Sequence, residues 1–139
     1  MERFFGERTA VIRDASGRSP EDYYQLLLNI WSAETCAPRM RKDWTLDNPT
    51  LGQCSVTAFL MQDCFGGEVK GIKLPDGSIH CFNSVDDVVF DLTSAQFGET
   101  PLPYGEGVKQ ERETHFAKEE KRLRYESLRE ALQKKASGR

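Results

Sequence analysis

The residue with the clearest capacity for chemistry is Cys54, which stands where turn-forming residues meet an apolar stretch. Residues 48–53 contain proline, threonine and glycine, and residues 56–61 are apolar at every position but one. This change predicts that a helix begins at or near the cysteine. The unpaired amides of a helix N-terminus carry partial positive charge, which favours a thiolate over a thiol. Cys54 is therefore a candidate nucleophile.

A possible base, His80, and a possible orienting carboxylate, Asp91, follow in a region whose pattern predicts β-strands. A symmetric turn between Val85 and Asp86 would place the two side chains directly opposite one another in an antiparallel hairpin. Cross-strand neighbours have Cβ atoms about 5 Å apart on one face, which is close enough for a hydrogen bond. A slip of one residue would put them on opposite faces of the sheet.

Together these residues could form a thiol catalytic triad. His80 would take the proton of Cys54, and Asp91 would hold the imidazole in one tautomer. Amides at the start of the helix are natural donors to a developing oxyanion. Gln53 could add a side-chain donor, although it could equally cap the helix. The substrate would contain an amide, ester or thioester carbonyl.

Other interpretations of the same residues stay open. The four cysteines include no C-x-x-C pair, and a free cysteine is often just a small buried apolar residue. Cys54, Cys81, His80 and Asp91 could instead bind zinc, but Cys81 should point to the opposite face from His80. The other histidine, His115, lies in a charged C-terminal segment. We expect no metal and no cofactor.

Two helices are predicted in the first half of the chain. A serine followed by proline and two acids favours a first helix start, and apolar residues at helical spacing continue it over about residues 20–33. A second helix should cover about residues 50–65, capped by Asn48 or by Thr50 together with Gln53. Its apolar residues cover nearly the whole circumference, which predicts a position in the middle of the fold.

Alternating apolar and polar residues then predict strands over residues 68–74, 78–82 and 88–92, with a break at Gly71 that could be a bulge. A short strand over residues 9–12 is also expected. Three consecutive antiparallel strands against a buried helix make an α+β domain.

The C-terminal segment, about residues 110–135, is dense in charge and carries a narrow apolar stripe at Tyr125, Leu128 and Leu132. It predicts an amphipathic helix that docks on its own domain, as charge-rich helices usually do, or on a partner. We expect a single domain over residues 1–139, with its core in about residues 20–108.

The composition limits the class of protein to which this chain can belong. A chain of 139 residues, 38% of them hydrophobic, suits one domain with one core. Its net charge of −3 offers no cationic field for nucleic acid or an anionic membrane. The first residues lack the apolar run of a signal peptide, and no stretch approaches the ~20 apolar residues of a membrane span. We expect a cytoplasmic protein, monomeric or a small homo-oligomer, with no nucleic-acid or membrane partner.

The order of helix-start cysteine, strand histidine and next-strand aspartate resembles that of papain-like and transglutaminase-like thiol enzymes. Asp91-Leu92-Thr93 is similar to the aspartate strand of transglutaminase-like domains. The chain resembles the YunG-like family of small bacterial proteins more closely, over about residues 20–135. The segments that carry this resemblance are residues 48–58, Gln62-Asp63, Gly66-Gly67-Glu68, His80, Asn83, 91–93, Gln96-Phe97, and Arg124-Tyr125 with Leu128.

These resemblances imply a papain-like or transglutaminase-like scaffold. A buried helix carrying Cys54 at its N-terminus would pack on a small antiparallel sheet, with flanking N- and C-terminal helices. The triad follows by analogy, with Gln53 and Asn83 as supporting residues. The oxyanion glutamine of papain-like enzymes lies several residues before the cysteine, whereas Gln53 is adjacent to it.

The leading hypothesis is therefore a thiol hydrolase or acyltransferase that acts on a carbonyl-containing substrate. The alternative is a binding or structural module without turnover. In that module Cys54 would be buried, and the charged last helix would contact a protein partner.

Overall fold

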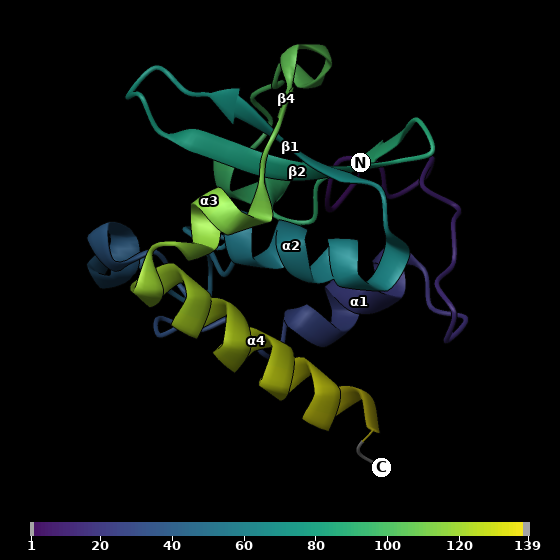
Figure 1. Ribbon diagram of the computed structural model, residues 1–139, viewed down its shortest axis with the longest axis horizontal. Helices are drawn as coiled ribbons and strands as arrows, with labels where there is room; N and C mark the ends of the chain where they lie inside the picture. The colour runs from purple at the N-terminus through teal and green to yellow at the C-terminus, as the bar shows by residue number, and fades with distance from the viewer. Residues whose placement is uncertain (1, 138–139) are drawn as a thin grey trace.

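A small antiparallel sheet, a central helix and a layer of outer helices are stacked on one another in the computed structural model, which describes residues 2–137 (Figure 1). The α+β class is thereby confirmed. The helices are α1 (Pro20–Leu27), α2 (Cys54–Phe65), α3 (Arg112–Phe116) and α4 (Glu119–Ser137), with short 3₁₀ turns η1 (Pro38–Asp43), η2 (Ser94–Phe97) and η3 (Tyr104–Glu106). The strands β1 (Glu68–Lys73), β2 (Ile79–Val85), β3 (Val88–Phe90) and β4 (Val108–Lys109) lie in the order β3-β2-β1-β4. Residue 1 and residues 138–139, which the predicted domain includes, lie outside the described residues.

Helix α2 occupies the middle layer, as its apolar circumference predicts. Every residue from Ser55 to Met61 is buried, with the sheet on one side and α4 on the other (Figure 1). The predicted start at Thr50 was wrong, because the helix begins at Cys54 and has no side-chain cap. Gly52 has a φ of +70°, a left-handed conformation that a right-handed helix cannot contain. The cysteine is consequently the first helical residue.

The sheet contains the three predicted strands and one strand that was not predicted. The two-residue strand β4 pairs with β1 at Lys70 and Gly71, and residues 9–12 form no strand. Gly71 is also not a bulge, since the register of β1 against β2 is continuous through it. A Cβ atom there would lie 2.7 Å from Nε2 of Gln110, so the missing side chain makes room for that glutamine.

The turn between β2 and β3 differs from the predicted one. Asp86 and Asp87 have φ angles of 50° and 67°, which suits a two-residue turn of type I′. This turn pairs Val85 with Val88 and Ser84 with Val89, whereas the predicted opposition of His80 and Asp91 would place Val89 opposite Phe82. The predicted register was therefore wrong by two residues.

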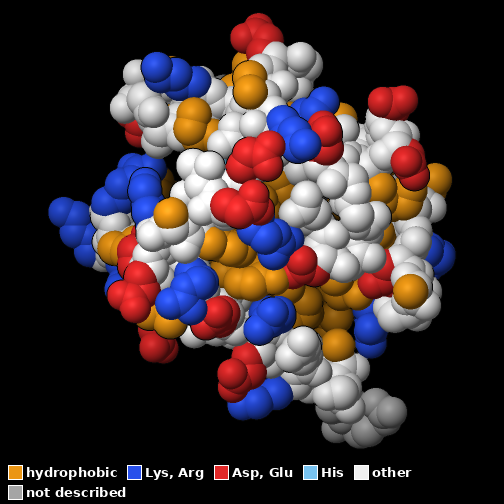
Figure 2. Space-filling view, in the orientation of Figure 1, with side chains coloured by type: hydrophobic (Ala, Val, Ile, Leu, Met, Phe, Trp, Pro, Cys, Tyr) orange, Lys and Arg blue, Asp and Glu red, His pale blue; other side chains and the backbone are white. Residues whose placement is uncertain are grey.

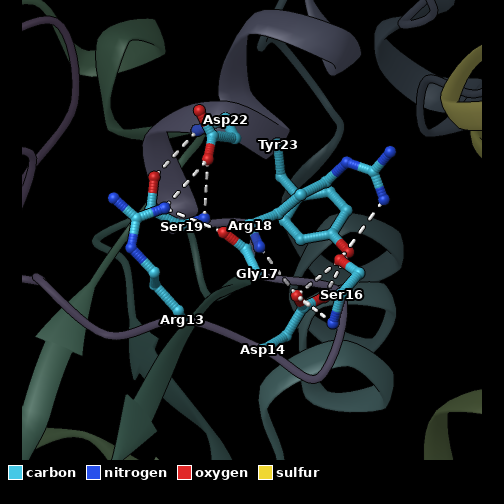
Figure 3. Close-up of polar contacts among 8 residues, drawn as sticks. All are labelled: Arg13, Asp14, Ser16, Gly17, Arg18, Ser19, Asp22 and Tyr23. Carbon is cyan, nitrogen blue, oxygen red and sulfur yellow. Dashed lines mark hydrogen bonds and ion pairs between the residues drawn. The ribbon is translucent and has the colours of Figure 1, made fainter.

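The N-terminal segment is organised by the carboxylate of Asp14. It accepts hydrogen bonds from the amides of Ser16 and Arg18 and from the hydroxyl of Tyr23 in α1 (Figure 3). Ser19 caps α1 in a reciprocal capping box, as its position predicts. Helix α1 ends at Leu27, however, well before the predicted end.

The charged C-terminal segment docks on its own domain, as expected, but as two helices. Tyr125, Leu128 and Leu132 of α4 are buried in the same core as α1 and α2. Figure 2 shows acidic and basic side chains mixed over the face on which α4 lies. Arg112 joins this layer to the end of α2, with its guanidinium 2.7 Å from Asp63 and 3.0 Å from the Phe59 carbonyl oxygen. Among residues 2–137, no helix is long and apolar enough to cross a bilayer.

The close approach at Gly67 gives a test of the packing between α2 and the sheet. A Cβ atom at Gly67 would lie 2.4 Å from the Ser84 carbonyl oxygen, whereas one at Gly77 would meet nothing within 4 Å. Both glycines have positive φ, so Gly67→Ala and Gly77→Ala share the conformational cost. We expect Gly67→Ala to lower the free energy of unfolding by about 1–3 kcal/mol more than Gly77→Ala in urea titrations. Equal losses would contradict this packing.

Candidate active site

Cys54 opens onto a cavity at the N-terminal end of α2. The cavity has a volume of about 760 Å³, and its lining includes Cys54, His80, Gln96 and Lys121. It is bounded by η1, by the turn between β1 and β2, and by the junction of α3 and α4, which Figure 1 shows at the left. The cysteine is partly exposed, and its sulfur lies 3.9 Å from the carbonyl oxygen of Ile79 in β2.

The structure brings His80 and Asp91 together. Nε2 of His80 lies 2.6 Å from Oδ2 of Asp91, and both side chains are only 1% exposed. The hydroxyl of Tyr104 donates to the same oxygen at 2.7 Å, and the amide and hydroxyl of Thr93 lie 3.2 Å from the other. Because Nε2 faces the carboxylate, Nδ1 is the ring nitrogen available to Cys54.

The two side chains meet although the predicted register was wrong. Continuing the observed pairing would place Asp91 opposite Phe82, two residues along β2 from His80. A shift of two residues preserves the face of the sheet, and a diagonal neighbour is still within reach of long side chains. Asp91 is held there by a bridge to the N-terminal segment, where its amide donates to the Phe5 carbonyl oxygen at 3.0 Å.

The surroundings of Cys54 favour its thiolate. A hydrogen bond from the thiol of Cys81 lowers the pKa of Cys54 most, and hydrogen bonding and charge attraction by His80 lower it further against the cost of burial. Burial lowers the pKa of His80, but its bonds with Asp91 and Cys54 outweigh this and raise it to about 10. Both shifts favour a thiolate–imidazolium pair.

Cys81, which is expected on the opposite face of β2 from His80, lies beside Cys54 and does not line the cavity. Its thiol and its amide both hydrogen-bond to the sulfur of Cys54, and this contact raises the pKa of Cys81 well above the ordinary value. A protonated thiol is a donor, so Cys81 supports the anionic form of Cys54. Among residues 2–137, no group of three or more histidine, cysteine or acidic side chains is arranged to hold a metal ion.

Gln53 and Asn83 do not line the cavity. The side chain of Gln53 is fully buried, accepts from the Thr35 hydroxyl at 2.8 Å and donates to the Ser32 carbonyl oxygen at 3.0 Å. Its amide therefore bonds to the loop after α1, away from the cavity. Asn83 donates to the Ala58 carbonyl oxygen at 2.8 Å and ties β2 to α2. Both residues position the site without entering it.

Two further residues, Tyr104 and Gln96, contact the site although no role is predicted for them. Tyr104 lies in a segment rich in proline and glycine, where nothing in the sequence indicates a bond to Asp91. Gln96 belongs to a segment that carries the family resemblance. Its side chain accepts from the amide of Gly52 at 3.4 Å and donates to the Thr93 carbonyl oxygen at 2.9 Å, so it links the two segments that carry Cys54 and Asp91.

Comparison with known proteins identifies relatives but no solved structure. The model of the YunG protein family matches residues 19–137. A protein of Bacillus subtilis (strain 168), described as "Uncharacterized protein YunG", is 40% identical over 107 residues, which are 77% of this chain and 85% of that protein. No solved structure matches the chain significantly. The papain-like or transglutaminase-like scaffold therefore has no support from a structural relative.

Alkylation across pH tests the ionisation of Cys54. Because its pKa is lowered, the rate of iodoacetamide labelling should fall much less between about pH 9 and about pH 7 than it does for an ordinary thiol. Cys64 provides an internal control, because burial raises its pKa and its labelling should fall over the same interval. Peptide mass spectrometry would measure both rates. In His80→Gln, the labelling of Cys54 should become more dependent on pH, while the contact with Cys81 still lowers the pKa of Cys54. An unchanged profile would exclude the pairing with His80.

Proposed function

We propose that this chain, which belongs to the YunG protein family, is a thiol enzyme that hydrolyses or transfers an acyl group. Cys54 would be the nucleophile, His80 the base and acid, and Asp91 the residue that orients His80. The observation that carries the proposal is the buried bond of 2.6 Å between His80 and Asp91 beside a cysteine with a lowered pKa in a cavity.

In the proposed first half-reaction, the sulfur of Cys54 bonds to the carbonyl carbon and the π electrons move to the oxygen. The amides of Cys54 and Ser55, which have no backbone acceptor among the described residues, can donate to that oxyanion. As the tetrahedral intermediate collapses, the bond to the leaving group breaks. His80 gives its Nδ1 proton to the departing nitrogen, oxygen or sulfur, which leaves an acyl-thioester on Cys54.

In the second half-reaction, water or another nucleophile gives a proton to the neutral imidazole of His80 and attacks the thioester. Collapse of this second intermediate releases the carboxylic acid or the transferred acyl product and restores the thiolate–imidazolium pair. Asp91 orients and stabilises the imidazolium. Its four hydrogen bonds, from His80, Tyr104 and Thr93, support that role because they fix the carboxylate behind the ring.

The local order of elements supports a papain-like or transglutaminase-like arrangement within the α+β fold. A helix-start cysteine, a histidine on the neighbouring strand and an aspartate after the next strand are combined as in those enzymes. The alternative function is a binding module that uses the same cavity without turnover.

An acyl-enzyme assay separates the two functions. With p-nitrophenyl acetate as the probe, we expect a rapid release of p-nitrophenol and an acetyl group on Cys54, located by peptide mass spectrometry. Asp91→Asn should lower kcat/KM by about 10²–10⁴-fold through loss of the tautomer and of the imidazolium charge. Cys64→Ser, which changes a thiol outside the cavity, is the matched control and should keep full activity. Acetylation of Cys64 and Cys54 at equal rates would leave only the binding module.

A further inference from the structure

Lys121 projects into the same cavity as Cys54 and is held in place by a second histidine. Its ammonium nitrogen lies 2.9 Å from Nδ1 of His115, and Nε2 of His115 lies 2.9 Å from Oε1 of Gln110. Burial and the charge of Lys121 lower the pKa of His115 to about 4, so the ring is neutral. It therefore accepts from the lysine at one nitrogen and donates to the glutamine at the other.

Gln110 anchors this chain of contacts to the sheet. Its amide donates to the Val69 carbonyl oxygen at 2.8 Å, and its side chain packs over Gly71, where a Cβ atom would lie 2.7 Å from Nε2. The position of Lys121 is thus set by contacts that run from β1 through Gln110 and His115. A side chain held by such contacts loses less entropy on binding a ligand than a free surface lysine does.

Lys121 has no acidic partner. Over residues 2–137, no carboxylate lies within ion-pair distance of its ammonium group, which is rare for a half-buried lysine. Two more cations, Arg39 and Lys118, line the cavity without an ion pair among the described residues. Of the acids that line it, Glu120 is neutralised by Arg124 at 2.8 Å and only Asp76 is left.

The cavity therefore carries an excess of positive charge in a protein whose net charge is −3. The thiolate of Cys54 and the imidazolium of His80 cancel one another and do not change this excess. Such a local field attracts anions and repels cations, independently of the charge of the whole molecule.

We propose that this cavity binds an acyl substrate that carries a carboxylate, and that Lys121 is the residue that recognises the carboxylate. The inference rests on the proposed function, because it assigns the substrate class of that site. One of the three ammonium donors is engaged by His115, and two are left for the two oxygens of a carboxylate. Arg39 and Lys118, which also line the cavity, attract the same group.

Two alkylating reagents test this directly. Iodoacetate and iodoacetamide attack the same thiolate and differ in a carboxylate, so the ratio of their rates at Cys54 is independent of how much thiolate is present. We expect Lys121→Met to lower the ratio of iodoacetate to iodoacetamide about tenfold, which is the contribution of one charged hydrogen bond. Lys121→Arg should restore most of it. Lys109→Met removes the same charge from β4, outside the cavity, and should leave the ratio unchanged.

The outcomes separate this inference from the proposed function. Fast iodoacetamide labelling with a ratio that Lys121→Met does not change would overturn carboxylate recognition and leave the thiol enzyme intact. Slow labelling of Cys54 by both reagents would overturn the proposed function itself. Acetate and inorganic phosphate, compared as protectants of Cys54 at equal ionic strength, identify the anion. Better protection by acetate supports a carboxylate, and better protection by phosphate would overturn it.

Discussion

Everything at this site depends on one constraint, which is that a buried imidazole needs partners at both ring nitrogens. A charged or half-satisfied histidine in the interior would cost several kcal/mol. His80 avoids this cost through Asp91, and Asp91 in turn takes donors from Tyr104 and Thr93. These partners all follow β3 in the chain, and the N-terminal bridge at Phe5 fixes the strand end that carries Asp91. The segments after β3 are thus folded around one hydrogen-bonded pair.

The second requirement is a fixed distance between that pair and the thiol. Helix α2 provides it because the helix is buried between the sheet and α4, so its first residue cannot move independently of β2. Asn83 and Gln53 act at this level. One ties β2 to the helix, and the other ties the turn before the helix to the loop after α1. Their value lies in holding Cys54 and His80 in one geometry, which is what preorganised catalysis requires.

How far the sequence predicts this site can be traced residue by residue. The placement of Cys54 in or near the first helical turn follows from local patterns. So does the same-face placement of His80 and Asp91, because periodicity decides which face a side chain occupies. The register, the first residue of α2 and the role of Gly71 do not follow. They depend on the left-handed conformations of Asp86, Asp87 and Gly52 and on a contact with Gln110, none of which an apolar pattern encodes. Tyr104 and Lys121 join the site through long-range packing alone.

The neutrality of His115 explains why a second histidine stands in this cavity. A carboxylate could hold Lys121 equally well, but it would cancel the ammonium charge and leave nothing to attract an anion. A neutral imidazole fixes the position of the lysine and preserves its charge. Burial lowers the pKa of Lys121, and the neighbouring sulfurs of Cys81 and Cys54 oppose that shift. The two histidines thus differ in charge, and both charge states favour the binding of an anionic substrate at Cys54. His80 is charged to stabilise the thiolate, and His115 is uncharged so that the positive charge beside that thiolate remains available to a substrate.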